Sequence, residues 1–224
     1  MENNYFTGPN NAWLQKRLGR FTASEIHKIF QSGRKKGEMF GQGAMTYIRT
    51  KAAELLTMEV KEDIDFKQGE WGKANERDAV LTMEKLLGVQ GKHYGMIEPE
   101  FFSYGAFAGC SPDWESMPDG ADVKCPYNSA EHVKNLMLVS ADEFREERWE
   151  YYCQLQMSII VRKWEKAYFF SYDPRMVEQQ HRYKILTIYP DSVWQKEFHE
   201  RITAGVELVN SILETIMSFE PIIN

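Results

Sequence analysis

Short β-type runs from about residue 92 to about residue 125 lie between two helical stretches and decide the fold class of this chain. Pro, Gly and the turn sequence Pro118-Asp-Gly divide the runs His93–Ile97, Phe101–Gly109 and Ala121–Cys125. Such strands need helices packed on them to bury their apolar faces. The pattern therefore favours an α/β sheet flanked by helices and disfavours a helical bundle or a barrel.

Helical patterns account for most of the remaining sequence. Thr22-Ala-Ser-Glu25 fits a capping box, with Thr22 as the N-cap of a helix. No repeat or linker interrupts the chain, so we expect residues 1–224 to form one domain. The other predicted elements are helices at about 44–58, 70–88 (ending at Gly88), 129–163 (broken near Ser140) and 191–219, and strands at Ala167–Tyr172 and Tyr183–Tyr189.

Composition excludes several classes of protein. Apolar residues make up 43% of the 224 residues, which is enough for a well-buried core. No apolar run is long enough to span a bilayer, and the start, MENNYFTGPNN, lacks the basic and apolar regions of a secretory signal. The 3 cysteines are too few for a disulfide framework or a zinc site. We therefore expect a cytoplasmic protein with no membrane partner.

Charge is distributed unevenly along the chain. The net charge is −6, but residues 1–51 hold nine basic and three acidic side chains (+6), which leaves 18 basic and 30 acidic ones (−12) for residues 52–224. A glycine-flanked loop with Arg34, Lys35 and Lys36 suits a phosphate backbone, although a solvated surface loop explains it equally well. The asymmetry predicts that any DNA contacts lie mainly within residues 16–51.

Two carboxylates and a lysine form the most informative pattern. Asp113, at the end of Cys110-Ser-Pro-Asp113, is separated by eight residues from Asp122-Val-Lys124. Because side chains alternate along a strand, Asp122 and Lys124 share one face. A turn at Pro118-Asp-Gly would fold Asp113 beside them, with Asp119 as a turn residue.

This pattern suits metal-assisted hydrolysis of a phosphodiester. Carboxylate oxygens, together with the Val123 carbonyl, are ligands that Mg²⁺ prefers, and a nearby lysine can orient or deprotonate the attacking water. The spacing alone is only moderately specific, since an exposed hairpin of mixed charge explains it about as well. A third carboxylate favours the metal interpretation, because Glu76 lies on the apolar stripe of its predicted helix, where a carboxylate needs a partner or a cation.

Other polar residues are candidates for binding phosphate. Arg17 precedes the capped helix, and Ser24 lies in its first turn, which together suit an anion, although Ser24 fits equally well as a helix-start residue. Tyr151 and Gln154 lie on one polar face of the helix near 146–162, where an interhelical hydrogen bond is the commoner explanation. None of the five histidines has metal-ligand spacing.

Linked motifs in order along residues 13–190 make the chain similar to the phage lambda-type exonucleases, the YqaJ-like viral recombinase family of PD-(D/E)xK nucleases. The matching segments are Trp13…Arg17-Leu18-Gly19, Thr22-Ala-Ser-Glu25, Trp71-Gly-Lys73 with Glu76 and Asp78-Ala79, Cys110-Ser-Pro-Asp113, Asp122-Val-Lys-Cys-Pro126, Gln154-Leu-Gln156 and Tyr172-Asp-Pro-Arg-Met176. The resemblance implies a restriction-endonuclease-like core with a central mixed β-sheet flanked by helices.

The resemblance also implies an activity and partners. It implies Mg²⁺-dependent (or Mn²⁺-dependent), processive 5′→3′ digestion of one strand of linear duplex DNA to 5′-mononucleotides, which leaves a 3′ overhang for phage recombination. It further implies a ring-shaped homotrimer, a single-strand annealing partner and a site in the host cytoplasm. The alternatives are a restriction or structure-specific endonuclease, or a DNA-end-binding protein without catalysis.

Roles carry over from the family position by position. The implied metal ligands are Asp113, Asp122 and, at the helical acidic position, Glu76, with Lys124 as the catalytic lysine. The implied pocket for the 5′-phosphate consists of Arg17, Ser24, Ser111 and Gln154, with Tyr151 as a neighbour. Two positions depart from the pattern: Asp122 stands where close relatives can carry Glu, and Gly69 stands where an apolar side chain could help to part the strands.

Overall fold

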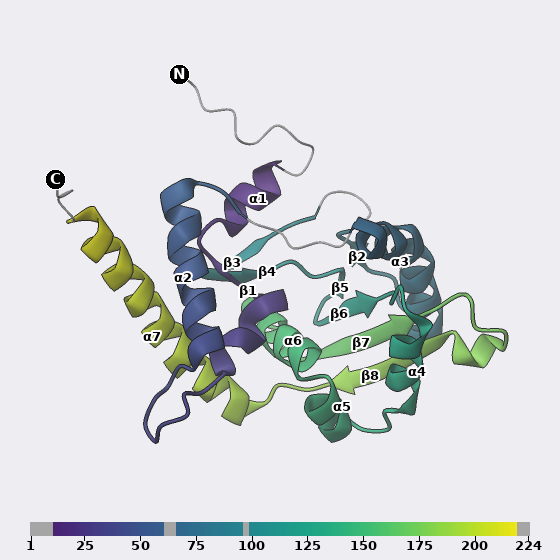
Figure 1. Ribbon diagram of the computed structural model, residues 1–224. Helices are drawn as coiled ribbons and strands as arrows, with labels where there is room; N and C mark the ends of the chain where they lie inside the picture. Colours follow the sequence, from purple (N-terminus) through teal and green to yellow (C-terminus); the bar gives the residue numbers. More distant parts are fainter. Residues whose placement is uncertain (1–10, 61–65, 96–98, 219–224) are drawn as a thin grey trace.

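The computed structural model describes residues 11–60, 66–95 and 99–218, which form two small mixed sheets surrounded by helices (Figure 1). The helices are α1 (Asn11–Arg17), η1 (Ala23–Phe30), α2 (Gln42–Thr57), α3 (Phe66–Leu87), α4 (Ser129–Met137), α5 (Ala141–Glu147), α6 (Trp149–Arg162), η2 (Gln179–His181) and α7 (Ser192–Met217). The strands are β1 (Phe21–Thr22), β2 (Lys92–His93), β3 (Phe102–Tyr104), β4 (Ala108–Cys110), β5 (Trp114–Ser116), β6 (Asp119–Lys124), β7 (Lys166–Tyr172) and β8 (Tyr183–Ile188).

The larger sheet has five strands in the order β2-β5-β6-β7-β8, and the smaller has three in the order β1-β4-β3. The pairs β6–β7 and β1–β4 are parallel, and the others are antiparallel. A parallel pair needs a long crossover connection. Between β6 and β7 this connection contains α4, α5 and α6, so it brings α6 onto the sheet beside β6 and β7.

Strand β7 is buried on both faces, as its nearly continuous apolar sequence requires. On one face, Tyr168 and Phe170 pack in one apolar cluster with Ala79, Val80 and Met83 of α3. On the other face, Ala167 and Phe169 belong to the main core together with apolar residues of α6. The central strands are therefore enclosed between α3 and α6, and the predicted α/β class with a mixed sheet flanked by helices is confirmed.

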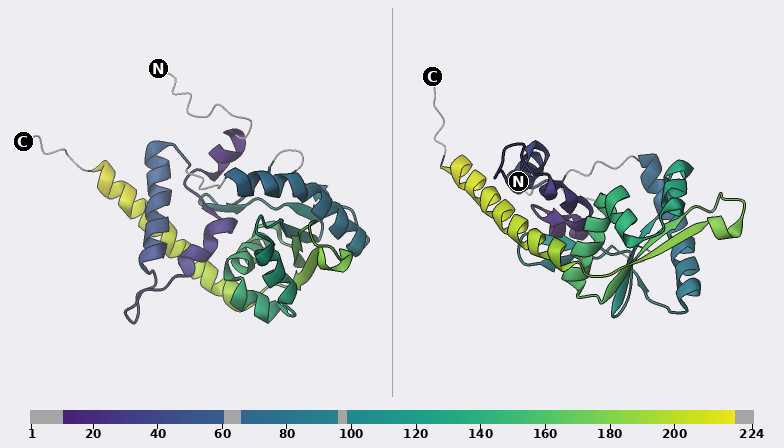
Figure 2. Two further views of the ribbon diagram at one scale, coloured as in Figure 1. Left: turned by 45° about the vertical axis from the view of Figure 1, so that its right-hand side comes forward. Right: turned by 90° about the horizontal axis from the view of Figure 1, so that it is seen from below.

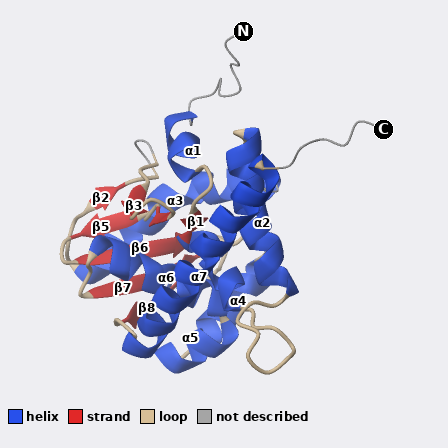
Figure 3. Cartoon of the chain, turned by 90° about the vertical axis from the view of Figure 1, so that its left-hand side faces the viewer, coloured by secondary structure: helices blue, strands red, loops and turns tan. Residues whose placement is uncertain are grey.

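A second group of helices lies beside this sandwich. Helices α2 and α7 pack against each other and against η1, to one side of the five-stranded sheet (Figure 3). Helix α7 begins at its N-cap Asp191, whose carboxylate accepts the backbone N–H groups of Val193 and Trp194. No described helix is long and apolar enough to cross a bilayer. All three cysteines are free, as expected.

Most predicted elements are present, but three local details differ. Thr22 is the N-cap residue, as predicted, but the element that it begins is a 3₁₀ helix and its side chain makes no capping hydrogen bond, so the capping box itself is absent. The predicted strand Phe101–Gly109 is two strands, β3 and β4, that turn at Gly105. Of the predicted strand His93–Ile97, only His93 lies in a strand, β2, because the chain bends at Tyr94 and turns at Gly95. Residues 96–97 of that prediction, and residue 219 of the last predicted helix, lie outside the described residues.

The hairpin before the lysine motif also turns earlier than predicted. Its loop is Met117–Pro118, which contains a cis peptide bond, while Asp119 and Gly120 already pair with Ser116 and Glu115. Strand β5 was not predicted, because Trp114-Glu-Ser is too short to show a clear alternation of apolar and polar residues. Because β5 runs directly back from this turn, it brings Asp113 beside β6.

Candidate active site

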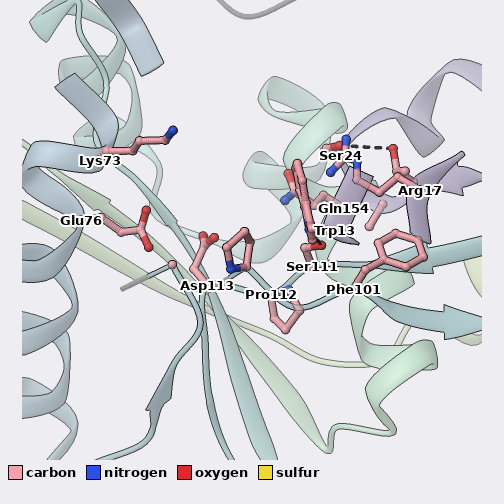
Figure 4. A pocket seen from close by; sticks show the side chains of 14 residues that line it. Trp13, Arg17, Ser24, Lys73, Glu76, Phe101, Ser111, Pro112, Asp113 and Gln154 are labelled. Carbon is pink, nitrogen blue, oxygen red and sulfur yellow. Dashed lines mark hydrogen bonds between the residues drawn. The ribbon is translucent and has the colours of Figure 1, made fainter. Parts of the chain in front are cut away.

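A pocket of about 440 Å³ lies between α3 on one side and α1 with η1 on the other (Figure 4). Lys73 and Glu76 extend into it from α3, while Arg17, Ser24 and Gln154 lie at the opposite end. Its lining residues are Trp13, Arg17, Thr22, Ala23, Ser24, Lys73, Glu76, Gly95, Pro99, Phe101, Ser111, Pro112, Asp113 and Gln154. Six of the residues singled out from the sequence therefore share one cavity: Arg17, Ser24, Glu76, Ser111, Asp113 and Gln154.

Asp122, Lys124 and Gln154 form a hydrogen-bonded group at the base of this region. Asp122 and Lys124 lie on the face of β6 that meets α6, and Lys124 Nζ lies 3.0 and 2.8 Å from the two oxygens of Asp122. Gln154 Nε2 donates to Asp122 Oδ1 at 2.6 Å, and its Oε1 lies 3.3 Å from Lys124 Nζ. Burial lowers the pKa of Lys124, but Asp122 and Asp113 raise it more, so the amine is held in its charged form.

Asp113 approaches β6 from the segment that precedes β5. Its Oδ2 accepts the backbone N–H of Val123 at 2.6 Å, which fixes the carboxylate between the two residues of the lysine motif. Burial raises the pKa of Asp113 well above its ordinary value, and the nearby carboxylate of Asp122 raises it further. The sequence spacing thus corresponds to a direct contact between the two arms of the motif.

Glu76 faces the same pocket from α3, one turn after Lys73 (Figure 4). Burial raises its pKa, and the charge of Asp122 adds to this effect, although Lys124 opposes it. The carboxylate packs against Gly95, where a Cβ atom would lie 1.8 Å from Glu76 Oε1. A side chain at position 95 would therefore displace Glu76 from its present place in the cleft.

These groups suit a hard divalent cation. Their oxygens are the donors that Mg²⁺ prefers, and the mutual repulsion of Asp113, Asp122 and Glu76 is the charge that a cation would neutralise. Asp122 Oδ2 is buried and accepts no hydrogen bond, although it lies 2.8 Å from Lys124 Nζ. Within the described part of the chain, no group of three or more Asp, Glu, His or Cys side chains is placed so that it could hold a metal ion. The fit to a cation therefore rests on the chemistry of these oxygen donors.

The opposite end of the pocket carries hydroxyl groups and a guanidinium. The Trp13 ring lies 4.2 Å from the Arg17 guanidinium, and its Nε1 donates to Ser111 Oγ at 2.8 Å. Ser24 is exposed in the first turn of η1, and its hydroxyl lies 3.4 Å from that of Thr22. Together with the Gln154 amide, these groups form a cationic and hydrogen-bonding surface that suits a phosphate.

Several predicted residues lie outside the pocket. Tyr151 does not line it, but its ring lies 5.1 Å from Lys124 Nζ and stacks on Phe169. The exposed loop with Arg34, Lys35 and Lys36 joins η1 to α2, at the end of α2 that is far from α1 (Figures 1 and 2). A separate hollow of about 560 Å³ is lined by Asp142, Arg145, Glu146 and Trp149 and contains none of the predicted site residues.

The basic excess of residues 1–51 is smaller at the surface than the sequence suggested. Lys51 is only 3% exposed and pairs with Glu54 at 2.7 Å, and it lies 3.8 Å from Glu25. Lys28 pairs with Glu25. Lys51 therefore links α2 to η1, and Lys28 is paired within η1, so neither lysine is a free cation.

Trp13, Lys73 and Phe101 line the pocket without having been assigned a role from the sequence. For Trp13 a local signal existed, because Trp13 and Arg17 are four residues apart and therefore neighbours on one helix face. The contact between Trp13 and Ser111 spans 98 residues, and no local pattern predicts it.

The raised pKa of Asp113 predicts an effect on stability. An acid whose pKa is raised by folding stabilises the folded state below its unfolded pKa, and this contribution is lost as pH rises. We therefore expect Asp113→Asn to raise the melting temperature in EDTA at pH 8, and we expect this rise to be smaller at pH 4. Each kcal/mol of added stability corresponds to a rise of roughly 2–4 °C. Thermal unfolding at both pH values checks this. A lower melting temperature at pH 8 would indicate a structural role for Asp113 instead.

Comparisons with known proteins identify the family and the fold of this chain. A model of the YqaJ-like viral recombinase domain matches residues 12–165. No curated protein compared with the chain matches it. An alkaline exonuclease from Laribacter hongkongensis has a similar structure, with a TM-score of 0.74 and 20% identity over 92% of this chain and 95% of that one, and its complex with dAMP gives the same values. A phage-related exonuclease from Haemophilus somnus 129PT has a TM-score of 0.72 and 15% identity over 88% and 96% of the chains.

Proposed function

We propose that this chain, which belongs to the YqaJ-like viral recombinase family as its motifs predicted, is an exonuclease that removes mononucleotides from the 5′ ends of linear duplex DNA. The observation that carries the proposal is a single pocket with carboxylates at one end and an anion-binding surface at the other (Figure 4). A terminal 5′-phosphate bound at the second end would bring the next phosphodiester toward the carboxylates. The solved exonucleases that share this fold, one of them in complex with dAMP, support the same activity.

The proposed substrate contacts follow from the side chains at the anion-binding end. Arg17 would bind the terminal phosphate through its guanidinium, and the hydroxyls of Ser24 and Ser111 and the amide of Gln154 would donate hydrogen bonds to it. Because these groups lie opposite Glu76 and Asp113, we propose that they set the step of one nucleotide for each cleavage.

At the acidic end, Asp113, Asp122, the Val123 carbonyl and Glu76 would hold Mg²⁺, with Mn²⁺ as a substitute. When bound, the cation supplies Lewis-acid stabilisation of the phosphate and lowers the pKa of a bound water. Lys124, protonated and fixed by Asp122 and Gln154, would donate a hydrogen bond to the phosphate or to the attacking water. Because its Nζ lies against Asp122 and the Gln154 carbonyl oxygen, we propose that Lys124 acts as a hydrogen-bond donor rather than as the base. The ring of Tyr151 beside its Nζ helps to keep the amine in place.

Family membership supports a wider role. We propose that digestion is processive, leaves a 3′ overhang and supplies single strands to an annealing protein for phage recombination in the host cytoplasm. We also propose a ring-shaped homotrimer threaded by DNA, in which Arg34, Lys35 and Lys36, remote from the pocket of their own subunit, contact the duplex.

A topology-resolved nuclease assay tests the activity. With Mg²⁺ and end-labelled linear duplex, we expect release of 5′-mononucleotides, faster from 5′-phosphorylated than from 5′-hydroxyl ends, and no cutting of closed circles. Arg17→Ala should reduce the preference for the 5′-phosphate while leaving slow cleavage of 5′-hydroxyl ends. Equal cutting of closed circles would indicate an endonuclease, and end binding without any cleavage would indicate a non-catalytic protein.

A further inference from the structure

Arg175 joins three segments at the edge of the site, although the proposed mechanism does not use it. Its Nε and Nη2 each lie 2.8 Å from one oxygen of Asp173, at the end of β7. Its Nη1 and Nη2 donate to the carbonyls of Tyr127 and Pro126 at 3.0 and 3.1 Å. Its guanidinium lies 4.2 Å from the centre of the Trp71 ring on α3. One side chain thus contacts β7, the segment after β6 and α3.

Two of these segments hold the residues of the acidic site: α3 carries Glu76, and the segment after β6 adjoins Asp122 and Lys124. Helix α3 presents Glu76 five residues after Trp71, and the segment at Pro126 follows Lys124 directly. Ala79, Val80 and Met83 hold the second half of α3 on the sheet. In the first half, Trp71 lies against Arg175 and meets the ring of Tyr127 edge-on, with the ring centres 6.2 Å apart. Glu76 therefore lies between the part of α3 packed on the sheet and the part held by Trp71.

The guanidinium is itself rigidly anchored. Asp173 is fully buried, and its Oδ1 also accepts the backbone N–H of Arg175 at 3.0 Å. Burial raises the pKa of Asp173, but hydrogen bonds from Arg175 and Ser129 lower it more, so the carboxylate stays ionised opposite the guanidinium. A planar group with five N–H donors in a fixed fork can serve a carboxylate, two carbonyls and an aromatic face at once, whereas an ammonium cannot.

We propose that Arg175 is a positioning residue that fixes the separation between Glu76 on α3 and the pair Asp122 and Lys124 on β6. It acts through Trp71 on one side and through the backbone of residues 126–127 on the other. The inference rests on the proposed role of these acidic residues in holding Mg²⁺. Residues behind a metal site typically change metal affinity or activity by about 10–100-fold when they are replaced.

The test compares Arg175→Lys, which keeps a charge opposite Asp173, with Arg182→Lys as the matched control. Arg182 lies in the same connection and donates to the Met176 carbonyl. For R175K we expect the half-saturating Mg²⁺ concentration to rise at least about ten-fold, both in DNA cleavage and in Mg²⁺-dependent thermal stabilisation without DNA. The KM for DNA ends, and binding of 5′-phosphorylated duplex in EDTA, should match wild type. R182K should match wild type in all four of these measurements.

Trp71 supplies a second, independent variant. Trp71→Leu removes the face on which the guanidinium lies, so it should raise the Mg²⁺ requirement in the same way, whereas Trp71→Phe should retain most of the wild-type behaviour. If the two residues act as one unit, W71L combined with R175K should be little worse than either alone.

Two outcomes would overturn the inference. One is a lower melting temperature for R175K with an unchanged Mg²⁺ dependence, which is the result of a purely structural role. The other is a double variant, R175K with W71L, whose Mg²⁺ requirement reflects the full sum of the two single effects. A wild-type protein that is stabilised by Mg²⁺ but does not cleave DNA would instead reject the proposed function, and the thermal titration would still decide the role of Arg175.

Discussion

Replacement of Asp122 by asparagine should lower the rate of DNA cleavage by roughly 10²–10³-fold, the size of the effect when an enzyme loses one group on which electrostatic stabilisation of the transition state depends, because the cation would be held less well. Asparagine has the same shape, so the loss would come from the missing charge toward the cation and toward Lys124, 2.8 Å away. Single-turnover digestion of 5′-phosphorylated duplex in excess Mg²⁺ measures the effect. Binding of the same duplex in EDTA should be unchanged, because Arg17 and the two serines remain in place.

Asp119→Asn is the matched control, since Asp119 begins the same strand. It pairs with Lys166 at 3.4 Å and accepts the Tyr168 hydroxyl at 3.2 Å, and it does not line the pocket. We expect this variant to cleave DNA at close to the wild-type rate. Comparable losses in D119N and D122N would show that the strand, and not a specific carboxylate, is being disturbed, and the proposed metal site would have to be abandoned.

Contacts within one element were predictable from the sequence. Alternation along a strand places Asp122 and Lys124 on one face, and this is where they lie, in direct contact. Helical periodicity identified Glu76 as an inward-facing carboxylate on α3, and its pKa is raised by burial. Strands β6, β7 and β8 and the helices between β6 and β7 were also predictable, because each has a clear apolar pattern of its own.

Contacts between distant segments were not predictable in the same way. Arg162 lies in the last turn of α6, where helical periodicity gives no indication of its partner, yet it forms an ion pair with Glu115, 47 residues earlier. Glu115 lies in β5, which has only three residues and no clear alternation. The loop of Arg34, Lys35 and Lys36 was correctly read as exposed, but local sequence could not indicate how far from the pocket it lies. In each case the missing information is the tertiary arrangement, which no period of 2 or 3.6 residues encodes.

Glu115 is the centre of a buried polar network on the same face of the sheet as Asp122, because it pairs with Gly120, two residues before Asp122 in β6. It is only 8% exposed, and each of its oxygens accepts two hydrogen bonds. Arg162 donates from Nε and Nη2 at 2.9 and 2.7 Å, Trp164 from Nε1 at 2.7 Å, and the Tyr94 hydroxyl at 2.7 Å. Burial raises the pKa of Glu115, but these donors lower it more, so the carboxylate is ionised in the folded protein.

Glu115→Ala should therefore lower the free energy of unfolding by about 3–5 kcal/mol, because it leaves the Arg162 guanidinium and two buried donors without their acceptor. Urea unfolding at pH 7 measures this loss, and Glu115→Gln, which keeps an acceptor oxygen but no charge, should lose less. A group whose pKa is lowered by folding stabilises the protein above its unfolded pKa, so the gap between wild type and E115A should narrow below about pH 4. A gap that stays constant down to pH 3 would mean that packing, and not the charge of Glu115, accounts for the loss. A loss below about 1 kcal/mol at pH 7 would show that water replaces the carboxylate and that the network contributes little to stability.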